Sequence, residues 1–333
     1  MKIAIFAAGT GGHIYPALSI AEKFGKENVI FIASNREIER KIYKNSGFKV
    51  SHLNISGFRG KNFLEKILWP FNLTSCVLIS IFLLIKYRPQ KVLLMGNYIS
   101  VIGLIASIFL FKDIYIHEQN AILGSANKFS LIFAKKLFTT FPLNEKKEHN
   151  FGQPVRSAFN TLSYATHSEK EHILVLGGSQ GALFFNNQIS EILGNLNLNE
   201  KILFQTGEHG KKPSTEKIEY IKFIENMPEV MAKSKFIICR AGASTVAEVQ
   251  SIGLPAVFIP LPNSIDDHQM KNAKLACNDG GGIVLNEKNF NEEEFSQKIS
   301  EFNQQNFQEL SKKMGKSIHL KSAEKIVHEI KQY

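Results

Sequence analysis

The sequence predicts an α/β protein with two doubly wound domains, each built on a buried parallel sheet. The first observation is length, because 333 residues suit two domains of about 150 residues each. The second is that short apolar runs, typical of buried parallel strands, alternate with helical patterns. The third is a repeat: residues 2–24 and 172–193 both read as strand, glycine loop and helix. We therefore expect two Rossmann-like domains.

The expected strands are short apolar or alternating runs between polar and glycine-containing segments. They cover residues 2–8, 29–33, 49–55, 91–95, 113–116, 136–140, 172–176, 201–206, 221–224, 236–239, 256–260 and 283–285. The segment FGQPVR at 151–156 leads into a polar stretch and reads as an interdomain crossing. We expect one domain over 1–157 and another over 158–317, and the C-terminal helix at 318–333 could join the first domain.

Composition limits the classes of partner and compartment. The net charge of +10 indicates an anionic partner, such as acidic lipid or a phosphorylated substrate. No signature of a nucleic-acid-binding module is visible in the sequence, so we do not expect nucleic acid as a partner. The three cysteines, Cys76, Cys239 and Cys277, have no metal-binding spacing and indicate a reducing compartment. The short N-terminal apolar run leads into a glycine turn, so we expect no signal peptide.

The first predicted strand leads into a glycine loop, Gly9-Thr10-Gly11-Gly12, followed by His13 and a helical pattern. Glycine loops between a strand and a helix form cradles for anions, because backbone N–H groups point outward together. The loop lacks the third glycine of the dinucleotide fingerprint. At the loop-to-helix junction His13 is well placed as a general base, although it could also serve only to cap or pack the helix.

A charge-free run between Lys66 and Lys86 is about as long as a membrane-spanning helix. Polar residues and Pro70 interrupt it, so we expect a buried or amphipathic helix instead of a membrane span. The preceding segment holds basic and aromatic residues that suit docking on an anionic bilayer. These residues are Phe58, Arg59, Lys61, Phe63, Lys66 and Trp69, which we expect to lie in a loop.

The stretch from Phe236 to Ala273 reads as strand, turn, helix, strand, loop and helix. Gly242 permits a tight turn, Ser244 and Thr245 can cap the helix, and Gly253 ends it. The helix start forms an anion site, and Glu248 one turn further can accept two hydrogen bonds from a vicinal diol such as ribose. Phosphate and ribose together indicate a nucleotide. An ordinary βαβ unit with a solvated Glu248 is the alternative.

Five motifs in this order and spacing resemble the MurG family of UDP-N-acetylglucosamine:lipid I N-acetylglucosaminyltransferases. They extend over nearly the whole chain: AAGTGGHIYPALSIA (7–21), HEQNAILGSAN (117–127), GQPVR (152–156), GGSQGA (177–182) and CRAGASTVAE with GLPAVFIPLP, DHQ and NA (239–273). The resemblance implies a GT-B fold, with two Rossmann-like domains facing each other across a cleft. It also implies transfer of GlcNAc from UDP-GlcNAc to lipid I.

By this resemblance the C-terminal domain binds UDP-GlcNAc. Glu248 holds the ribose, Ile224 lies against the uracil and Gln269 binds the sugar hydroxyls. The diphosphate is bound by Ser179 and by the start of the helix after Gly242, where the implied residues are Ala243, Ser244, Thr245 and Val246. The N-terminal domain binds the lipid-linked muramyl-peptide acceptor. Its residues that would reach the donor across the cleft are Thr10, Gly11, Gly12, Asn120 and Arg156.

The implied reaction is an inverting transfer to the 4-hydroxyl of the muramyl sugar, with His13 as the base. The sequence has no DxD motif, and Asp266 and Asp267 read as solvated loop residues, so we expect no metal and no cofactor. We expect a peripheral protein on the cytoplasmic face of the plasma (inner) membrane. An anionic membrane surface and other proteins of cell-wall synthesis are the further partners expected.

One motif departs from the family. The family's second glycine loop usually reads GGYVSGPG, whereas Gly96 to Gly103 here reads GNYISVIG. We expect Asn97 and Val101, at two glycine positions, to narrow the room for an acceptor phosphate.

Three alternatives stay open: another GT-B glycosyltransferase, a non-hydrolysing UDP-GlcNAc epimerase, and a catalytically silent sugar-nucleotide-binding module. The first shares the donor chemistry, the second lacks a membrane-facing acceptor site, and the third would function without His13.

Overall fold

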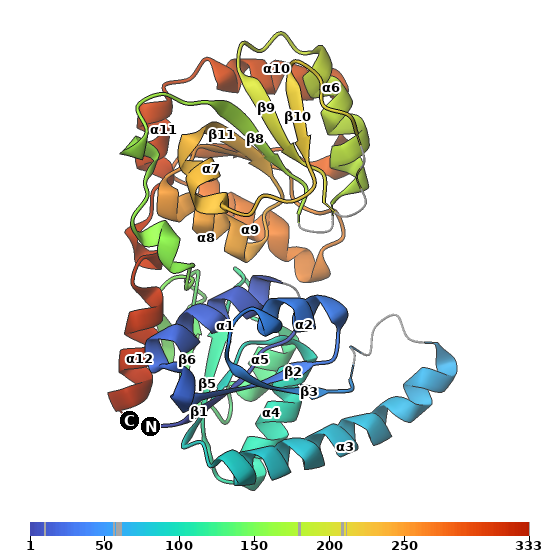
Figure 1. The fold of residues 1–333 in the computed structure, drawn as a ribbon, viewed down its shortest axis with the longest axis vertical. Helices are drawn as coiled ribbons and strands as arrows, with labels where there is room; N and C mark the ends of the chain where they lie inside the picture. Colours follow the sequence, from blue (N-terminus) through green and yellow to red (C-terminus); the bar gives the residue numbers. More distant parts are fainter. Residues whose placement is uncertain are drawn as a thin grey trace. The chain divides into compact units, whose positions relative to one another are not determined.

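The chain folds into two compact α/β units, each with its own parallel sheet (Figure 1). The computed structural model describes residues 1–9, 11–55, 57, 62–178, 181–207, 210 and 212–332, with the side chains of 63–66 and 265 excepted. Unit 1 comprises Met1–Arg156 and Lys321–Tyr333, and unit 2 comprises Ser157–Leu320. The C-terminal segment therefore returns to the unit that begins the chain.

The sheet of unit 1 has seven strands, and all of its strand pairs are parallel. In spatial order they are β3 (Lys49–Leu53), β2 (Val29–Ser34), β1 (Ile3–Phe6), β4 (Lys91–Leu94), β5 (Asp113–Glu118), β6 (Lys136–Thr139) and β7 (Glu148–Asn150). The prediction omitted β7. Its sequence is Glu-His-Asn and all three residues are half-buried, so it lacks the apolar pattern of the other strands.

The sheet of unit 2 has six strands, again with parallel pairs. In spatial order they are β10 (Ile218–Ile221), β9 (Lys201–Gln205), β8 (His172–Leu176), β11 (Ser234–Cys239), β12 (Ala256–Phe258) and β13 (Gly282–Val284). The predicted strand at 221–224 is wrong in position. The structure ends this strand at Ile221 and places Ile224 after it, in a loop.

Helices connect the strands in both units. Unit 1 contains α1 (Gly11–Phe24), α2 (Glu37–Lys44), α3 (Phe63–Tyr87), α4 (Asn97–Phe109), α5 (Ser125–Ser130) and α12 (Ser322–Gln332). Unit 2 contains α6 (Ser190–Asn195), α7 (Met227–Lys233), α8 (Ala243–Ile252), α9 (His268–Cys277), α10 (Glu292–Asn303) and α11 (Phe307–Met314). A π-helical turn, Phe185–Ile189, precedes α6.

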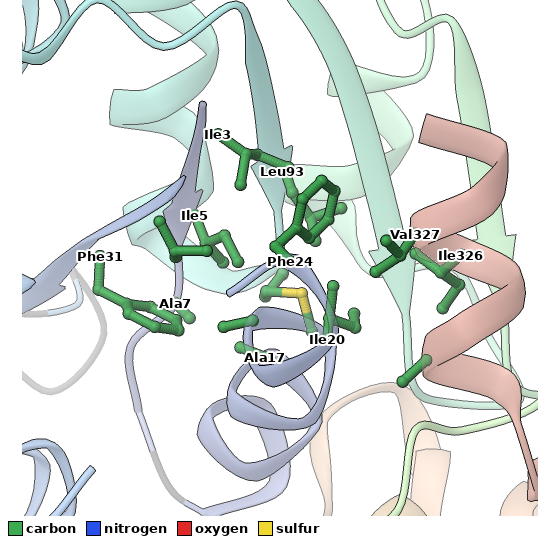
Figure 2. Close-up of a cluster of buried hydrophobic side chains, with 14 of the residues drawn as sticks. Ile3, Ile5, Ala7, Ala17, Ile20, Phe24, Phe31, Leu93, Ile326 and Val327 are labelled. Atoms are coloured by element: carbon green, nitrogen blue, oxygen red, sulfur yellow. The ribbon is translucent and has the colours of Figure 1, made fainter. Parts of the chain in front are cut away.

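The core of unit 1 follows the two-residue period of its central strand. Ile3 and Ile5 of β1 pack with α1 on one face, whereas Ala4 and Phe6 pack with α3 and α4 on the other. Figure 2 shows Ile326 and Val327 of α12 beside the side chains from α1 and the sheet. Ion pairs from Glu324 to Lys23 and from Glu329 to Lys136 also hold α12 in this unit.

The long helix α3 corrects two expectations. It begins at Phe63, so Phe63, Lys66 and Trp69 lie in the helix and not in a loop, while Phe58, Arg59 and Lys61 lie outside the described residues. Of the two forms expected for this segment, a buried or an amphipathic helix, the buried form is wrong, because seven large apolar side chains are at least 47% exposed: Ile67, Leu68, Phe71, Leu78, Ile79, Phe82 and Ile85. By length and composition alone, the segment Ile67–Tyr87 could cross a membrane.

Strand order locates the ligand-binding edge of each sheet. In unit 1 the order reverses between β1 and β4, and in unit 2 it reverses between β8 and β11. In open α/β sheets, ligands bind outside the carboxyl ends of the strands at such a switch point. The predicted glycine loops and the turn at Gly242 follow these four strands, so the topology places these loops and His13 at the two switch points.

Candidate active site

The loop after β1 leads directly into α1. Gly11 and Gly12 are the first two residues of this helix and His13 is the third, while Thr10 lies outside the described residues. A Cβ atom on Gly11 would approach the Tyr15 ring to 2.9 Å. The glycine therefore lets the backbone begin the helix close beside that ring. The predicted base thus sits in the first turn of α1, at the unit 1 switch point.

His13 is oriented by the end of the neighbouring strand. Its Nδ1 lies 2.9 Å from the carbonyl oxygen of Met95, which follows β4. A carbonyl oxygen can only accept, so in the neutral imidazole this contact places the proton on Nδ1 and the lone pair on Nε2. Gln119 also donates from Nε2 to the Met95 carbonyl, at 2.9 Å. His13 therefore has the tautomer that a general base requires.

The segment after β5 is organised by a buried carboxylate. Glu118 Oε1 accepts the backbone N–H of Asn120 at 3.0 Å, and Oε2 accepts from the Gly124 N–H at 2.9 Å and from Asn127 Nδ2 at 2.8 Å. Asn120 is thereby held just beyond the end of β5, which is the position predicted for it from the sequence. Burial and the neighbouring His13 lower the pKa of His117 to about 3, so this imidazole is neutral near pH 7.

Arg156 is the last residue of the first segment of unit 1. Its guanidinium carbon lies 5.5 Å from the centroid of the Tyr15 ring, which is within the range of a cation–π interaction. Tyr15 is in α1, two residues after His13. This contact therefore keeps the arginine in the neighbourhood of the glycine loop and its histidine.

The altered segment Gly96–Gly103 is mostly helical, not a loop. Helix α4 begins at Asn97, so Val101 lies inside the helix. Asn97 has φ of +58°, a left-handed conformation that asparagine tolerates better than most residues. Its side chain accepts the Ile99 N–H at 3.0 Å and donates to the Ala8 carbonyl at 2.5 Å. Asn97 thus links the two switch-point segments of unit 1.

In unit 2 the turn after β11 leads into α8. Gly242 is the N-cap of α8 and no side chain caps it, so the expectation that Ser244 and Thr245 cap the helix is wrong. Ala243, Ser244 and Thr245 are instead its first three residues. The Val246 N–H bonds to the Gly242 carbonyl at 2.9 Å, so residues 243–245 form the first turn of α8, with Ala243 buried and Ser244 and Thr245 half-buried. This arrangement suits binding of an anion.

The other residues of unit 2 predicted to bind UDP-GlcNAc lie in α8, after β10 and in α9. Glu248 lies in α8, half-buried, one turn after its first residues. The Ile224 side chain is buried and its N–H donates to Gln205 Oε1 at 3.0 Å. Gln269 is the second residue of α9, and its Oε1 accepts the Leu261 N–H at 2.9 Å. Ser179 lies outside the described residues.

The sequence reasoning assigned no role to Arg240, which lies under the turn at Gly242. The residue is 8% exposed, and its Nη1 donates to the Ile259 carbonyl at 3.1 Å and to Glu287. Its guanidinium carbon lies 4.7 Å from the Phe185 ring centroid. Arg240 thus joins the turn before α8 to the segment after β12. A single arginine in the CRAG motif was the only sequence signal for it.

Acidic residues in the described part of the chain do not assemble a metal site: no group of three or more His, Cys, Asp or Glu side chains there could hold an ion. Asp266 and Asp267 both have φ of +55° in the loop before α9.

Two domain models cover most of the chain. The model of the glycosyltransferase family 28 N-terminal domain matches residues 3–139, and that of the C-terminal domain matches residues 172–330. The second match runs into α12, which packs with unit 1. Both switch points described above lie inside the matched ranges.

Several curated relatives carry one name, UDP-N-acetylglucosamine--N-acetylmuramyl-(pentapeptide) pyrophosphoryl-undecaprenol N-acetylglucosamine transferase. The protein from Saccharophagus degradans is 35% identical over 313 residues, covering 87% of this chain and 80% of the relative. The protein from Histophilus somni is 30% identical over 330 residues, covering 94% and 92%.

Solved structures agree with these relatives. The crystal structure of Acinetobacter baumannii MurG is 27% identical, covers 100% of both chains and has a TM-score of 0.80. The calicheamicin glycosyltransferase CalG4 is 12% identical with a TM-score of 0.72, covering 100% of this chain and 98% of that one, and shows the GT-B fold alone. The chain belongs to the MurG family of N-acetylglucosaminyltransferases, within glycosyltransferase family 28.

Proposed function

We propose that this protein transfers N-acetylglucosamine from UDP-N-acetylglucosamine to the 4-hydroxyl of the muramyl sugar of lipid I, with inversion, to give lipid II. The observation that carries this proposal is that the chain has both a histidine fixed by the Met95 carbonyl at the switch point of unit 1 and an uncapped α8 start at the switch point of unit 2. A transferase needs both a base for its acceptor and a binding site for a charged leaving group.

Unit 1 supplies the base in this proposal. The acceptor oxygen attacks the anomeric carbon while its proton passes to Nε2 of His13, whose Nδ1 donates to the Met95 carbonyl. The hydrogen bond to that carbonyl oxygen stabilises the positive charge that develops on the imidazole ring. Thr10, Gly11 and Gly12 are assigned to substrate contact at the loop, together with Asn120 and Arg156 nearby.

Unit 2 supplies the leaving-group site. As the bond from the anomeric carbon to the diphosphate breaks, its electron pair leaves with UDP. The positive end of the α8 dipole and the N–H groups at 243–245 are assigned to that charge. Glu248 accepts hydrogen bonds from the ribose, Ile224 contacts uracil and Gln269 contacts the sugar. Ser179 adds a donor to the diphosphate.

A peripheral site on the cytoplasmic membrane face accompanies this function. The apolar outer face of α3, defined by Ile67, Leu68, Phe71, Leu78, Ile79, Phe82 and Ile85, is flanked by the exposed cations Lys86 and Arg88. A large exposed apolar face with basic neighbours suits an anionic bilayer surface. A lipid-linked acceptor would be presented at such a surface.

The transfer reaction is tested with labelled UDP-N-acetylglucosamine and a lipid I analogue, in the presence of EDTA. We expect a labelled β-linked product that requires the acceptor. Binding of UDP-N-acetylglucosamine without transfer would contradict the assigned acceptor, and absence of donor binding would contradict the whole assignment. Interconversion of UDP-sugars without an acceptor would indicate an epimerase.

Membrane docking is tested by sedimentation with anionic vesicles. We expect the protein to sediment with them and to be released by high salt, because surface charge interactions are screened. The double variant Phe71→Ser/Phe82→Ser should stay in the supernatant. The control Phe223→Ser, which changes a phenylalanine of unit 2 that is 56% exposed, should sediment normally. Release only by detergent would indicate a membrane-spanning helix.

A further inference from the structure

The backbone that leaves β1 is held by side chains from two other elements. Strand β1 ends at Phe6, and the next three residues lead toward the glycine loop. The Ala7 carbonyl accepts the Tyr43 hydroxyl at 2.8 Å, the Ala8 carbonyl accepts Asn97 Nδ2, and the Gly9 N–H donates to Glu39. Polar backbone groups buried outside a sheet need such partners. Here the partners come from α2 and from the first residue of α4.

Two of these contacts act on a single peptide group. The Ala8 carbonyl and the Gly9 N–H belong to the same planar unit, so Asn97 binds one side of it at 2.5 Å and Glu39 binds the other at 2.8 Å. Gly9 has φ of +109°, a backbone conformation that residues with a side chain rarely adopt. Glycine adopts positive and negative φ values about equally readily, so Gly9 by itself would allow the plane of this peptide to rotate. The two side chains therefore fix an orientation that the backbone would not keep by itself.

The Glu39 side chain is fully buried and its other contacts fix its position. Oε1 also accepts the Ser34 hydroxyl at 2.6 Å, and Oε2 accepts the Ser34 N–H at 3.0 Å. A buried carboxylate is costly unless several donors satisfy it. Three donors do so here, from the end of β2 and from the glycine loop. The carboxylate is thus held in one position, and its hydrogen bond to the Gly9 N–H fixes the start of the glycine loop.

We propose that Glu39 and Asn97 are positioning residues for transfer, which hold the Ala8–Gly9 peptide so that the following loop and His13 keep their reactive geometry. This inference rests on the proposed function. It also gives Asn97 of the altered GNYISVIG segment a different role. Asn97 supports the first glycine loop and does not narrow the binding site for an acceptor phosphate. The side chain is directed at Ala8, and a Cβ on Gly9 would meet Asn97 Nδ2 at 3.1 Å.

The activity test uses two variants with matched controls. Asn97→Gly tolerates positive φ and removes the brace without adding strain, and Glu39→Gln replaces one acceptor oxygen by a donor. Asn144→Gly is the control for the first, because Asn144 is exposed and also has φ of +58°. Glu148→Gln is the control for the second, because Glu148 accepts two backbone N–H groups and the Thr139 hydroxyl away from the switch point.

We expect both brace variants to lower kcat at least tenfold, with the Kd for UDP-N-acetylglucosamine within twofold of wild type. Glu148→Gln should lose stability and keep its kcat within twofold, which separates positioning from a merely structural role. An unchanged or higher kcat in Asn97→Gly would overturn the proposal and restore the view that Asn97 narrows the acceptor site.

A second readout does not depend on activity. Hydrogen exchange of the full-length protein, followed over residues 7–13, should quicken at least tenfold in Glu39→Gln and Asn97→Gly and stay unchanged in both controls. Unchanged exchange in the brace variants would overturn the proposal whether or not the wild type transfers sugar. Faster exchange in a protein that transfers nothing would instead contradict the proposed function.

Discussion

The two switch points of this protein differ in whether side chains form hydrogen bonds with the nearby backbone polar groups. In unit 1, side chains occupy the groups around the glycine loop: Tyr43, Asn97 and Glu39 bind residues 7–9, and His13 binds Met95. In unit 2, α8 starts at Gly242 without a side-chain cap. In the proposed reaction, the base must keep one orientation, whereas the diphosphate is bound at the start of a helix. The hydrogen-bonded loop of unit 1 and the α8 start of unit 2 would then serve different steps of that reaction.

The open start of α8 is still supported from below. The Arg240 side chain joins the turn to the Ile259 carbonyl and to Glu287, and its backbone N–H bonds to the Leu176 carbonyl. These contacts fix the turn that precedes the proposed anion-binding start of α8.

Removing His13 should give the largest effect and would test the braced side. We expect His13→Ala to lower kcat by about 10²- to 10⁴-fold, the usual contribution of a general base, with an unchanged Kd for UDP-N-acetylglucosamine. Steady-state transfer and calorimetric titration measure the two quantities. The control is His328→Ala, an exposed histidine on α12 that should behave as wild type. Equal losses in kcat and donor affinity would break the proposed division between the units.

A glycine in the unit 2 loop tests how closely that loop is packed. At Gly181, with φ of +79°, a Cβ would lie 2.1 Å from the Thr206 carbonyl oxygen. We expect Gly181→Ala to lower the free energy of unfolding by about 2–4 kcal/mol, from positive-φ strain and overpacking together. At Gly178 a Cβ would meet nothing within 4 Å, so Gly178→Ala should cost about 1–2 kcal/mol. Denaturant unfolding gives both values, and equal losses would show that the loop is not packed against Thr206.

Neutralising Glu248 tests the proposed nucleotide site at α8 in unit 2. A hydrogen bond to a charged group contributes about 1.5–3 kcal/mol, so Glu248→Gln should weaken UDP-N-acetylglucosamine binding by about 10- to 100-fold. The 2′-deoxy donor, which lacks the vicinal diol, should bind wild type and variant with similar affinity. Glu293→Gln on the surface of α10 is the control. A similar loss for both donors would assign Glu248 to something other than the ribose.

Acid should destabilise both units through buried histidines, of which His117 and His319 have the larger shifts in pKa. Burial lowers the pKa of His117 to about 3 in unit 1 and that of His319 to about 4 in unit 2, from an ordinary value of 6.5. The unfolded chain then binds more protons below pH 6.5, so the free energy of unfolding falls as the pH drops. The expected loss is about 1.4 kcal/mol per pH unit for each histidine, down to its folded pKa.

Urea unfolding between pH 7.5 and 5 measures this slope. His117→Asn and His319→Asn should each lower the slope by the contribution of one histidine, about 1.4 kcal/mol per pH unit. A slope that neither variant changes would assign the acid sensitivity to other groups.

The sequence alone predicted the elements that depend on local pattern. Apolar runs located the parallel strands, and glycine before a helical pattern located both switch-point loops and His13. Glu39 was not predicted, because it lies 30 residues from Gly9 and only the pairing of β1 with β2 brings the two together. Arg240 was missed for the same reason: its partners Ile259 and Glu287 are distant in the chain.

The errors also have physical causes. The face of α3 could not be assigned, because an apolar composition fits either a core or a surface that binds lipid. The strand at Ile218–Ile221 was placed too late, since Glu219 interrupts its apolar run while Ile221–Ile224 shows a denser one. The short strand β7 has a polar sequence at the sheet edge, where no apolar pattern is required.

The pH dependence of kcat at saturating donor and acceptor tests the role of His13 most directly. We predict that kcat falls on the acid side for the wild type, as the base becomes protonated, and that His13→Ala shows a low rate without this acid limb. If His13→Ala kept the same acid limb at a reduced rate, the proton would pass to another group, and His13 would be only a structural partner of the Met95 carbonyl.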